Sequence, residues 1–144
     1  DVKTLEFNCC MGDPETQPIM LRLKSDLVKL AEHAVNGTLD QIEAEWDRRT
    51  ALGVVMASAN YPDTPRTGDV ITGLPKGSDD MQVFHAGTAM KNDQVVTSGG
   101  RVLCVTALGE TVKYAQAQAY QALAEIKFDG AQYRQDIGYR AVKG

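Results

Sequence analysis

Cysteine is scarce in this chain of 144 residues and follows no functional spacing. The three cysteines are Cys9, Cys10 and Cys104, so the first two are adjacent and the total is odd. This pattern excludes a disulfide framework, and the lack of a C-x-x-C spacing excludes the common zinc and redox sites. Unpaired cysteines are typical of a reducing compartment, and we therefore expect a cytoplasmic protein.

Long apolar runs and an excess of basic residues are also missing. No apolar run approaches the roughly 18–20 residues that span a bilayer, and we expect no secretory signal before the first strand. The formal net charge of −4 argues against a general nucleic-acid binder, which needs a basic surface. We expect neither a membrane nor a nucleic acid as a partner, although one or two arginines or lysines could still bind a phosphate.

What is present is the composition of a globular protein, with 43% apolar and 24% charged residues. The length predicts one domain or one and a half. The chain opens at Asp1, without a methionine, in a segment that already has the pattern of a strand. Because a native protein seldom begins there, we expect a fragment or a cleaved product.

The strand expected over residues 2–9 carries the first chemical motif. Alternate residues of a strand point to the same face, so Glu6 and Asn8 lie side by side. Two oxygen-bearing side chains on one face can hold a hard cation such as Mg²⁺, which accepts few protein ligands and keeps room for water and phosphate. The alternative is the polar face of an edge strand.

Helices are expected between this strand and residue 46. Thr16 is expected to cap the first, with Pro18 in its first turn, where its missing N–H costs little. Ser25 or Asp26 is expected to start the second. The remaining boundaries are Asn36-Gly37, which ends the second helix, and residues 40–46, which form a short third one.

The pattern changes near residue 45, which predicts two units, 1–45 and 46–144. The second unit is expected to be small and mostly β, with Lys91-Asn92-Asp93 as a hairpin turn. Thr111 is expected to cap one long helix that ends at residues 128–130. Strands are expected over residues 52–57, 69–74, 82–90, 94–98 and 101–107.

Two basic groups are candidates for binding an anion. Gly99 and Gly100 would let a ligand approach the backbone, and Arg101 could grip a phosphate or carboxylate with two hydrogen bonds. The alternative is a tight turn with a surface arginine. The second group, in the tail, could likewise contact an anionic substrate or form a salt-bridged surface; it contains Arg134, Asp136 and Arg140.

Lys91 gives a different hypothesis. The run Ala89-Met90-Lys91 before a turn is similar to the hairpin on which biotinyl and lipoyl carrier domains carry their modified lysine. Asn92 stands where those domains have a second methionine, and no matching apolar frame surrounds it. A carrier module modified at Lys91 is therefore the weaker alternative.

Taken together, the motifs resemble those of the phosphoribosylamine–glycine ligase family over nearly the whole chain and in the family's order. The most specific stretches are residues 6–18 and 99–103. The others are residues 19–27, 51–57, Tyr61-Pro62, 83–88, 95–98, 128–130, 133–134 and 136–141.

This resemblance implies an α+β fold. Residues 1–45 would end an ATP-grasp core, and residues 46–144 would form a barrel-sandwich-hybrid domain. It also implies an ATP-dependent reaction that joins glycine to 5-phosphoribosylamine through glycyl phosphate, in purine biosynthesis. The partners would be glycine, 5-phosphoribosylamine, ATP and the missing N-terminal part of the same ligase, without which we expect no turnover. Another ATP-grasp ligase or carboxylase is the alternative.

The resemblance also assigns site residues. In the family, the positions of Glu6 and Asn8 hold the Mg²⁺ or Mn²⁺ that bridges the phosphates of ATP. Asp13 lies in the family's substrate-facing loop, and Arg101 matches its Gly-Gly-Arg element, so we expect both to contact substrate. One departure is Cys10, which stands where the family usually has an arginine.

Overall fold

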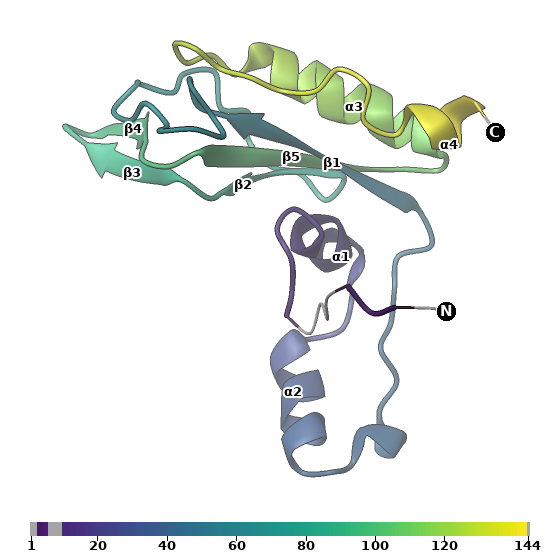
Figure 1. Cartoon of the computed structure of the whole chain (residues 1–144). Helices are drawn as coiled ribbons and strands as arrows, with labels where there is room; N and C mark the ends of the chain where they lie inside the picture. Colours follow the sequence, from purple (N-terminus) through teal and green to yellow (C-terminus); the bar gives the residue numbers. More distant parts are fainter. Residues whose placement is uncertain (1–2, 6–9, 144) are drawn as a thin grey trace.

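The computed structural model describes residues 3–5 and 10–143, which form a sheet with helices on both of its faces (Figure 1). The strand order is β1-β5-β2, and both pairs are antiparallel. A separate hairpin joins β3 to β4. This mixed α and β architecture agrees with the fold class expected from the sequence. The strands are β1 (Thr50–Ala57), β2 (Met81–His85), β3 (Thr88–Lys91), β4 (Gln94–Thr97) and β5 (Arg101–Gly109).

The core lies between the sheet and α3 (Val112–Glu125), which covers one face of the sheet (Figure 1). Strand β1 alternates, so Leu52, Val54 and Met56 point toward the helix and into the core. Ala115, Ala119, Ala122 and Leu123 of the helix meet them. The side chain of Thr111 accepts a hydrogen bond from the Tyr114 N–H and caps the helix, as the sequence predicts.

The opposite face of the sheet contacts α1 (Thr16–Arg22). A Cβ atom on Gly53 would lie 3.2 Å from Pro18 Cγ and 3.0 Å from Cys104 Sγ, so the helix packs closely on β1. Helix α2 begins at Leu27 with Asp26 as its cap, as expected, and extends away from the sheet (Figure 1). The smaller helical elements are α2 (Leu27–Val35), η1 (Leu39–Gln41) and α4 (Tyr139–Lys143).

A cluster of hydrogen bonds and ion pairs joins α1 to the sheet. The Arg22 guanidinium donates to the Asp47 carbonyl over 3.1 and 2.9 Å, and the Asp47 N–H donates back to the Arg22 carbonyl. Arg49 contacts both Asp47 and Asp80, the residue before β2. The hydrogen bonds from Arg49 hold the pKa of the Asp47 carboxyl far below its usual range. These contacts fix how the chain enters the sheet.

The hairpin expected around Lys91 is present. Asn92 and Asp93 form a two-residue loop between β3 and β4, with φ of 50° and 59°. Positive φ at both loop residues is the geometry that matches the twist of the flanking strands, and Asn and Asp tolerate it.

Some expected elements are absent. Residues 69–74 form no strand, because Val70 and Thr72 make isolated bridges to different segments, Val96 and Lys127. The strand expected over residues 82–90 is split into β2 and β3 at Ala86 and Gly87. Residues 3–5 of the first expected strand are not β, and its Glu6 and Asn8 lie outside the described residues.

Several helix boundaries also differ from those expected from the sequence. Thr16 is not a cap, since it lies inside α1 and its hydroxyl donates to the Gly12 carbonyl. The short helix expected over residues 40–46 is only the turn η1. The long helix ends before residues 128–130, because Lys127 pairs with Thr72 and the chain is extended from Ile126. Among the described helices, none is long and apolar enough to cross a membrane.

Candidate functional site

Asp13 and Arg101, which are 88 residues apart, are in contact. Arg101 Nη1 donates to the Asp13 carbonyl over 3.0 Å, and Arg101 Nε lies 3.2 Å from the Asp13 carboxylate. Their side chains remain 46% and 38% exposed, so both can still reach a ligand. The fold therefore brings together the two residues for which the family resemblance implies a contact with substrate.

Two glycines explain the position of Arg101. A Cβ on Gly87 would lie 2.7 Å from the Arg101 carbonyl and 2.8 Å from Gly99 Cα, so only glycine permits this backbone contact. A Cβ on Gly100 would lie 2.6 Å from the ring of Tyr61. The loop at Gly99 and Gly100, before β5, is thus packed between the β2–β3 connection and Tyr61.

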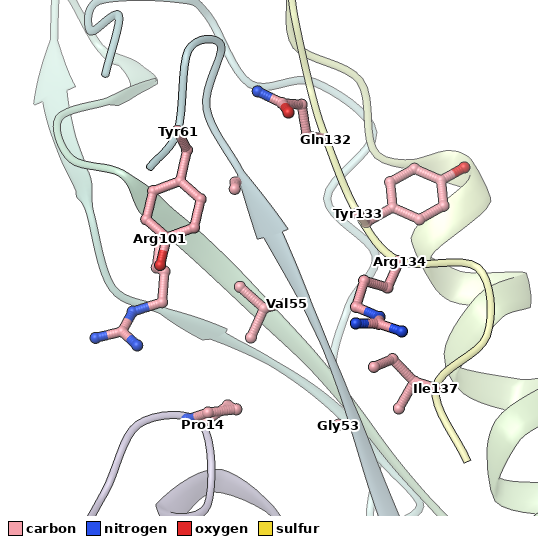
Figure 2. A pocket seen from close by; sticks show the side chains of 10 residues that line it. Pro14, Gly53, Val55, Tyr61, Arg101, Gln132, Tyr133, Arg134 and Ile137 are labelled. Atoms are coloured by element: carbon pink, nitrogen blue, oxygen red, sulfur yellow. The ribbon is translucent and has the colours of Figure 1, made fainter. Parts of the chain in front are cut away.

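A pocket of about 440 Å³ lies beside this pair. In Figure 2, Tyr61 and Arg101 stand on one side of β1, Tyr133, Arg134 and Ile137 stand on the other, and Val55 lies between them. The volume is within the range of small-molecule sites. The remaining lining residues are Pro14, Gly53, Ala57 and Gln132.

The far wall of the pocket, residues 132–137, is attached in two ways. At its start, Ala57 and Gln132 exchange main-chain hydrogen bonds of 2.7 and 2.8 Å. Farther along, the Tyr120 hydroxyl of α3 donates to the Arg134 carbonyl and accepts from the Ile137 N–H. Burial raises the pKa of Tyr120, so the hydroxyl keeps its proton at neutral pH.

The charged tail is a salt-bridged surface in part. Arg134 donates two hydrogen bonds to Asp136, of 2.9 and 2.7 Å, which raise the pKa of the guanidinium and lower that of the carboxyl. Arg140 does not join them and instead lies over the ring of Tyr139. Arg134 also lines the pocket, so its guanidinium stands at the rim.

The other sequence candidates are placed as follows. Glu6 and Asn8 lie outside the described residues, and within the described part of the chain no group of three or more His, Cys, Asp or Glu could hold a metal. Lys91 is exposed at the end of β3. Cys104 is buried, and burial raises the pKa of its thiol, whereas Cys10 is exposed.

The pocket also contains residues that the sequence did not single out as site residues. Tyr61 and Tyr133 belonged to matched family stretches, yet neither was given a role. Both lie in loops, where binding residues are disproportionately found, and that is the signal that could have pointed to them. Gln132 carries no comparable signal, since its position depends on the bridge to Ala57.

Comparisons with known proteins agree on one family. A family model described as phosphoribosylglycinamide synthetase, C domain, matches residues 51–140. The phosphoribosylamine–glycine ligase of Ralstonia nicotianae is 64% identical over 141 residues, which cover 98% of this chain and 33% of that protein. The ligase of Escherichia coli O157:H7 is 59% identical over 143 residues, with the same coverage of both chains.

A solved structure gives the same result. The crystal structure of phosphoribosylamine–glycine ligase from Thermotoga maritima superposes with a TM-score of 0.74 at 37% identity. The match covers 92% of this chain and 32% of that one. The chain thus spans about a third of the length of the relatives it matches. Neither a carrier domain modified at Lys91 nor another ATP-grasp enzyme is favoured by these matches.

Proposed function

Because the chain belongs to the phosphoribosylglycinamide synthetase family, we propose that it forms the C-terminal part of a phosphoribosylamine–glycine ligase. The observation that supports this most is the 64% identity to such a ligase over 98% of the chain. Residues 1–45 would complete an ATP-grasp core, and residues 46–144 would form a barrel-sandwich-hybrid domain. The remainder of the ligase is the proposed partner, and a cytoplasmic location suits a purine-pathway enzyme.

The proposed reaction consumes ATP and runs in two steps. The glycine carboxylate attacks the γ-phosphate of ATP, which gives glycyl phosphate and ADP. The amine of 5-phosphoribosylamine then attacks the carbonyl carbon of glycyl phosphate and expels phosphate. The amine loses a proton to solvent, and the product is glycinamide ribonucleotide.

Glu6 and Asn8 are the proposed holders of Mg²⁺ or Mn²⁺. Carboxylate and amide oxygens are hard ligands of the kind that Mg²⁺ prefers, and two of them leave room for water and phosphate. A divalent ion bound there would neutralise charge on the phosphates of ATP. The assignment rests on the chemistry of the two side chains.

Arg101 and Asp13 are the proposed substrate contacts. The guanidinium of arginine has five N–H donors on three nitrogens. Asp13 contacts only two of these nitrogens, Nη1 and Nε. The remaining donors suit the phosphate of 5-phosphoribosylamine, since arginine binds phosphate through paired hydrogen bonds. Asp13 would hold the guanidinium in the orientation that this contact needs.

ADP release that depends on both glycine and 5-phosphoribosylamine tests the function. The chain should release no ADP alone and should do so when mixed with the separately expressed remainder of the ligase. Association of the two parts without any activity would contradict the proposal.

Substitutions in the full-length ligase test the site. Arg101→Ala should raise the KM for 5-phosphoribosylamine by roughly tenfold or more, the loss expected for a charge-assisted contact, and Asp13→Asn should act in the same direction. Arg140→Ala is the matched control, because it removes a surface arginine outside the pocket. Unchanged kinetics in Arg101→Ala would remove the residue from the site.

A further inference from the structure

Within the described residues, strand β1 has an open edge inside the pocket. The Ser58 N–H donates to the Gly100 carbonyl, on the β5 side, whereas the Ala57 N–H donates to Gln132, on the other side. Main-chain groups alternate in direction along a strand, so Gly53 and Val55 face the same side as Ala57. That side is away from β5, and both residues line the pocket.

No strand pairs with this edge in the described part of the chain. The segment after Gln132 continues past Gly53 and Val55, yet no hydrogen bond joins it to either of them. A free strand edge presents a row of unpaired N–H and C=O groups, which is a template for pairing. The pocket is therefore lined by main-chain donors and acceptors as well as by side chains.

Helix α3 holds the facing segment away from β1. The Tyr120 hydroxyl bonds the Arg134 carbonyl over 2.6 Å and the Ile137 N–H over 3.1 Å. Gln116 Nε2 donates to the Ile137 carbonyl over 2.7 Å. These bonds satisfy main-chain groups that would otherwise be available to β1. The gap between the strand and its neighbour is thus built and held by side chains.

The chemistry of the gap fits a glycyl unit. An amine and a carbonyl separated by one CH₂ group are the main-chain donor and acceptor of a single strand residue. Such a unit can donate to one edge carbonyl and accept from one edge N–H, as a residue of an added strand does. Arg101 stands in the same pocket, where it can bind a phosphate at the other end of the ligand.

We propose that the edge of β1 at Gly53 and Val55 binds the glycyl unit of the substrate and of glycinamide ribonucleotide by main-chain pairing, and that Tyr120 is a positioning residue that keeps this edge open. The proposal rests on the ligase function given above. It adds a strand edge as the element that recognises glycine, with Arg101 recognising the phosphate.

Val55→Pro in the full-length ligase is the direct test. Proline removes an N–H that points away from β5, and edge strands tolerate it at such positions. We expect the KM for glycine to rise by about tenfold or more, with the KM for ATP unchanged. Ala51→Pro is the matched control, because the N–H of Ala51 also points away from β5 but Ala51 lies outside this pocket. This control should change the glycine KM by less than about twofold.

Tyr120→Phe tests the positioning role and remains decisive if Val55→Pro does not fold. It removes both hydroxyl bonds and keeps the ring, so the glycine KM should rise several-fold while kcat stays within about twofold. Tyr114→Phe, on the exposed side of the same helix, should have no effect. A loss of packing alone would lower the melting temperature without a selective change for glycine.

The outcomes separate this proposal from the proposed function. A wild-type ligase that is active, together with folded Val55→Pro and Tyr120→Phe enzymes of unchanged glycine KM, would overturn the strand-edge proposal alone. A wild-type enzyme without glycine-dependent ADP release would overturn both.

Discussion

The helical segment up to Trp46 and the sheet segment from Thr50 onward differ in what they bury. In the described part of the chain, every buried residue lies between Leu52 and Phe128, and none belongs to α1 or α2. The sheet segment has a core of its own, and it is also the part that the family model matches. The helical segment instead depends on its contacts with the sheet and on the Arg22, Asp47 and Arg49 cluster. Cooperative stability should therefore come from the sheet segment.

Truncation of one core residue should have the largest effect. Leu123 is 2% exposed and lies between α3 and the sheet. Leu123→Ala should lower the free energy of unfolding of the chain by about 2–5 kcal/mol, since it removes buried methyl groups and leaves a cavity. Val28→Ala in α2, where the side chain is 66% exposed, should change it by no more than about 0.5 kcal/mol. Denaturant unfolding measures both, and equal losses would contradict the contrast between the segments.

A backbone contact should rank second. Gly87→Ala places a methyl group against the Arg101 carbonyl and Gly99, where only backbone can move. We expect a loss of about 1–3 kcal/mol, the range for overpacking, together with a displaced Arg101. Gly77→Ala is the control, because its Cβ meets only the flexible end of Gln82. Thermal unfolding should separate the two variants, and similar melting temperatures would argue against the close approach.

The junction between the segments should give a smaller and more local effect. Arg49→Ala removes both ion pairs, so limited proteolysis should cut residues 36–49 faster while the melting of the sheet segment hardly changes. Arg48→Ala, at an exposed neighbour, is the control. If both variants are cut at the wild-type rate, the cluster does not hold the segments together.

The same junction should depend on pH. The hydrogen bonds from Arg49 hold the pKa of Asp47 below its usual value, so its contribution is fully present above the ordinary value of about 4 and is lost as the pH falls from there toward the lowered pKa. Proteolysis with an acid protease should accelerate in that window in the wild type. Asp47→Asn should remove the acceleration, and an identical pH profile in both proteins would contradict the assignment.

A turn substitution should give the smallest effect. Asp93 has φ of 59° in the β3–β4 hairpin, a conformation that glycine adopts without steric cost. Asp93→Gly should stabilise the chain by a few tenths of a kcal/mol, because Asn-Gly is the preferred pair for this turn. Thermal unfolding of the variant beside the wild type measures the gain. A clear destabilisation would mean that the side chain of Asp93 matters more than its backbone.

Elements that depend on local patterns were predictable. The apolar period of Ala115, Ala119 and Leu123 and the cap at Thr111 are enough to predict α3 and its start, though not its end. The turn residues predict the β3–β4 hairpin.

The strand expected over residues 69–74 does not form, because its pairing depends on segments that are distant in the sequence. Ile71 is buried and Leu74 packs against the core, but Val70 is exposed. The main chain pairs with two separate segments, and the sequence contains no signal for that choice.

For the site, the sequence by itself determined the candidates, and the tertiary structure decided their arrangement. The Gly-Gly-Arg element and Asp13 could be singled out through the resemblance of their motifs to the family's, because a motif is a local property of the chain. Their contact, the position of Tyr61 and the open edge of β1 could not, because each depends on segments far apart in sequence. The physical reason is that the type of each residue determines its side-chain chemistry, whereas the distances between residues and the pairing of strands depend on how the whole core packs.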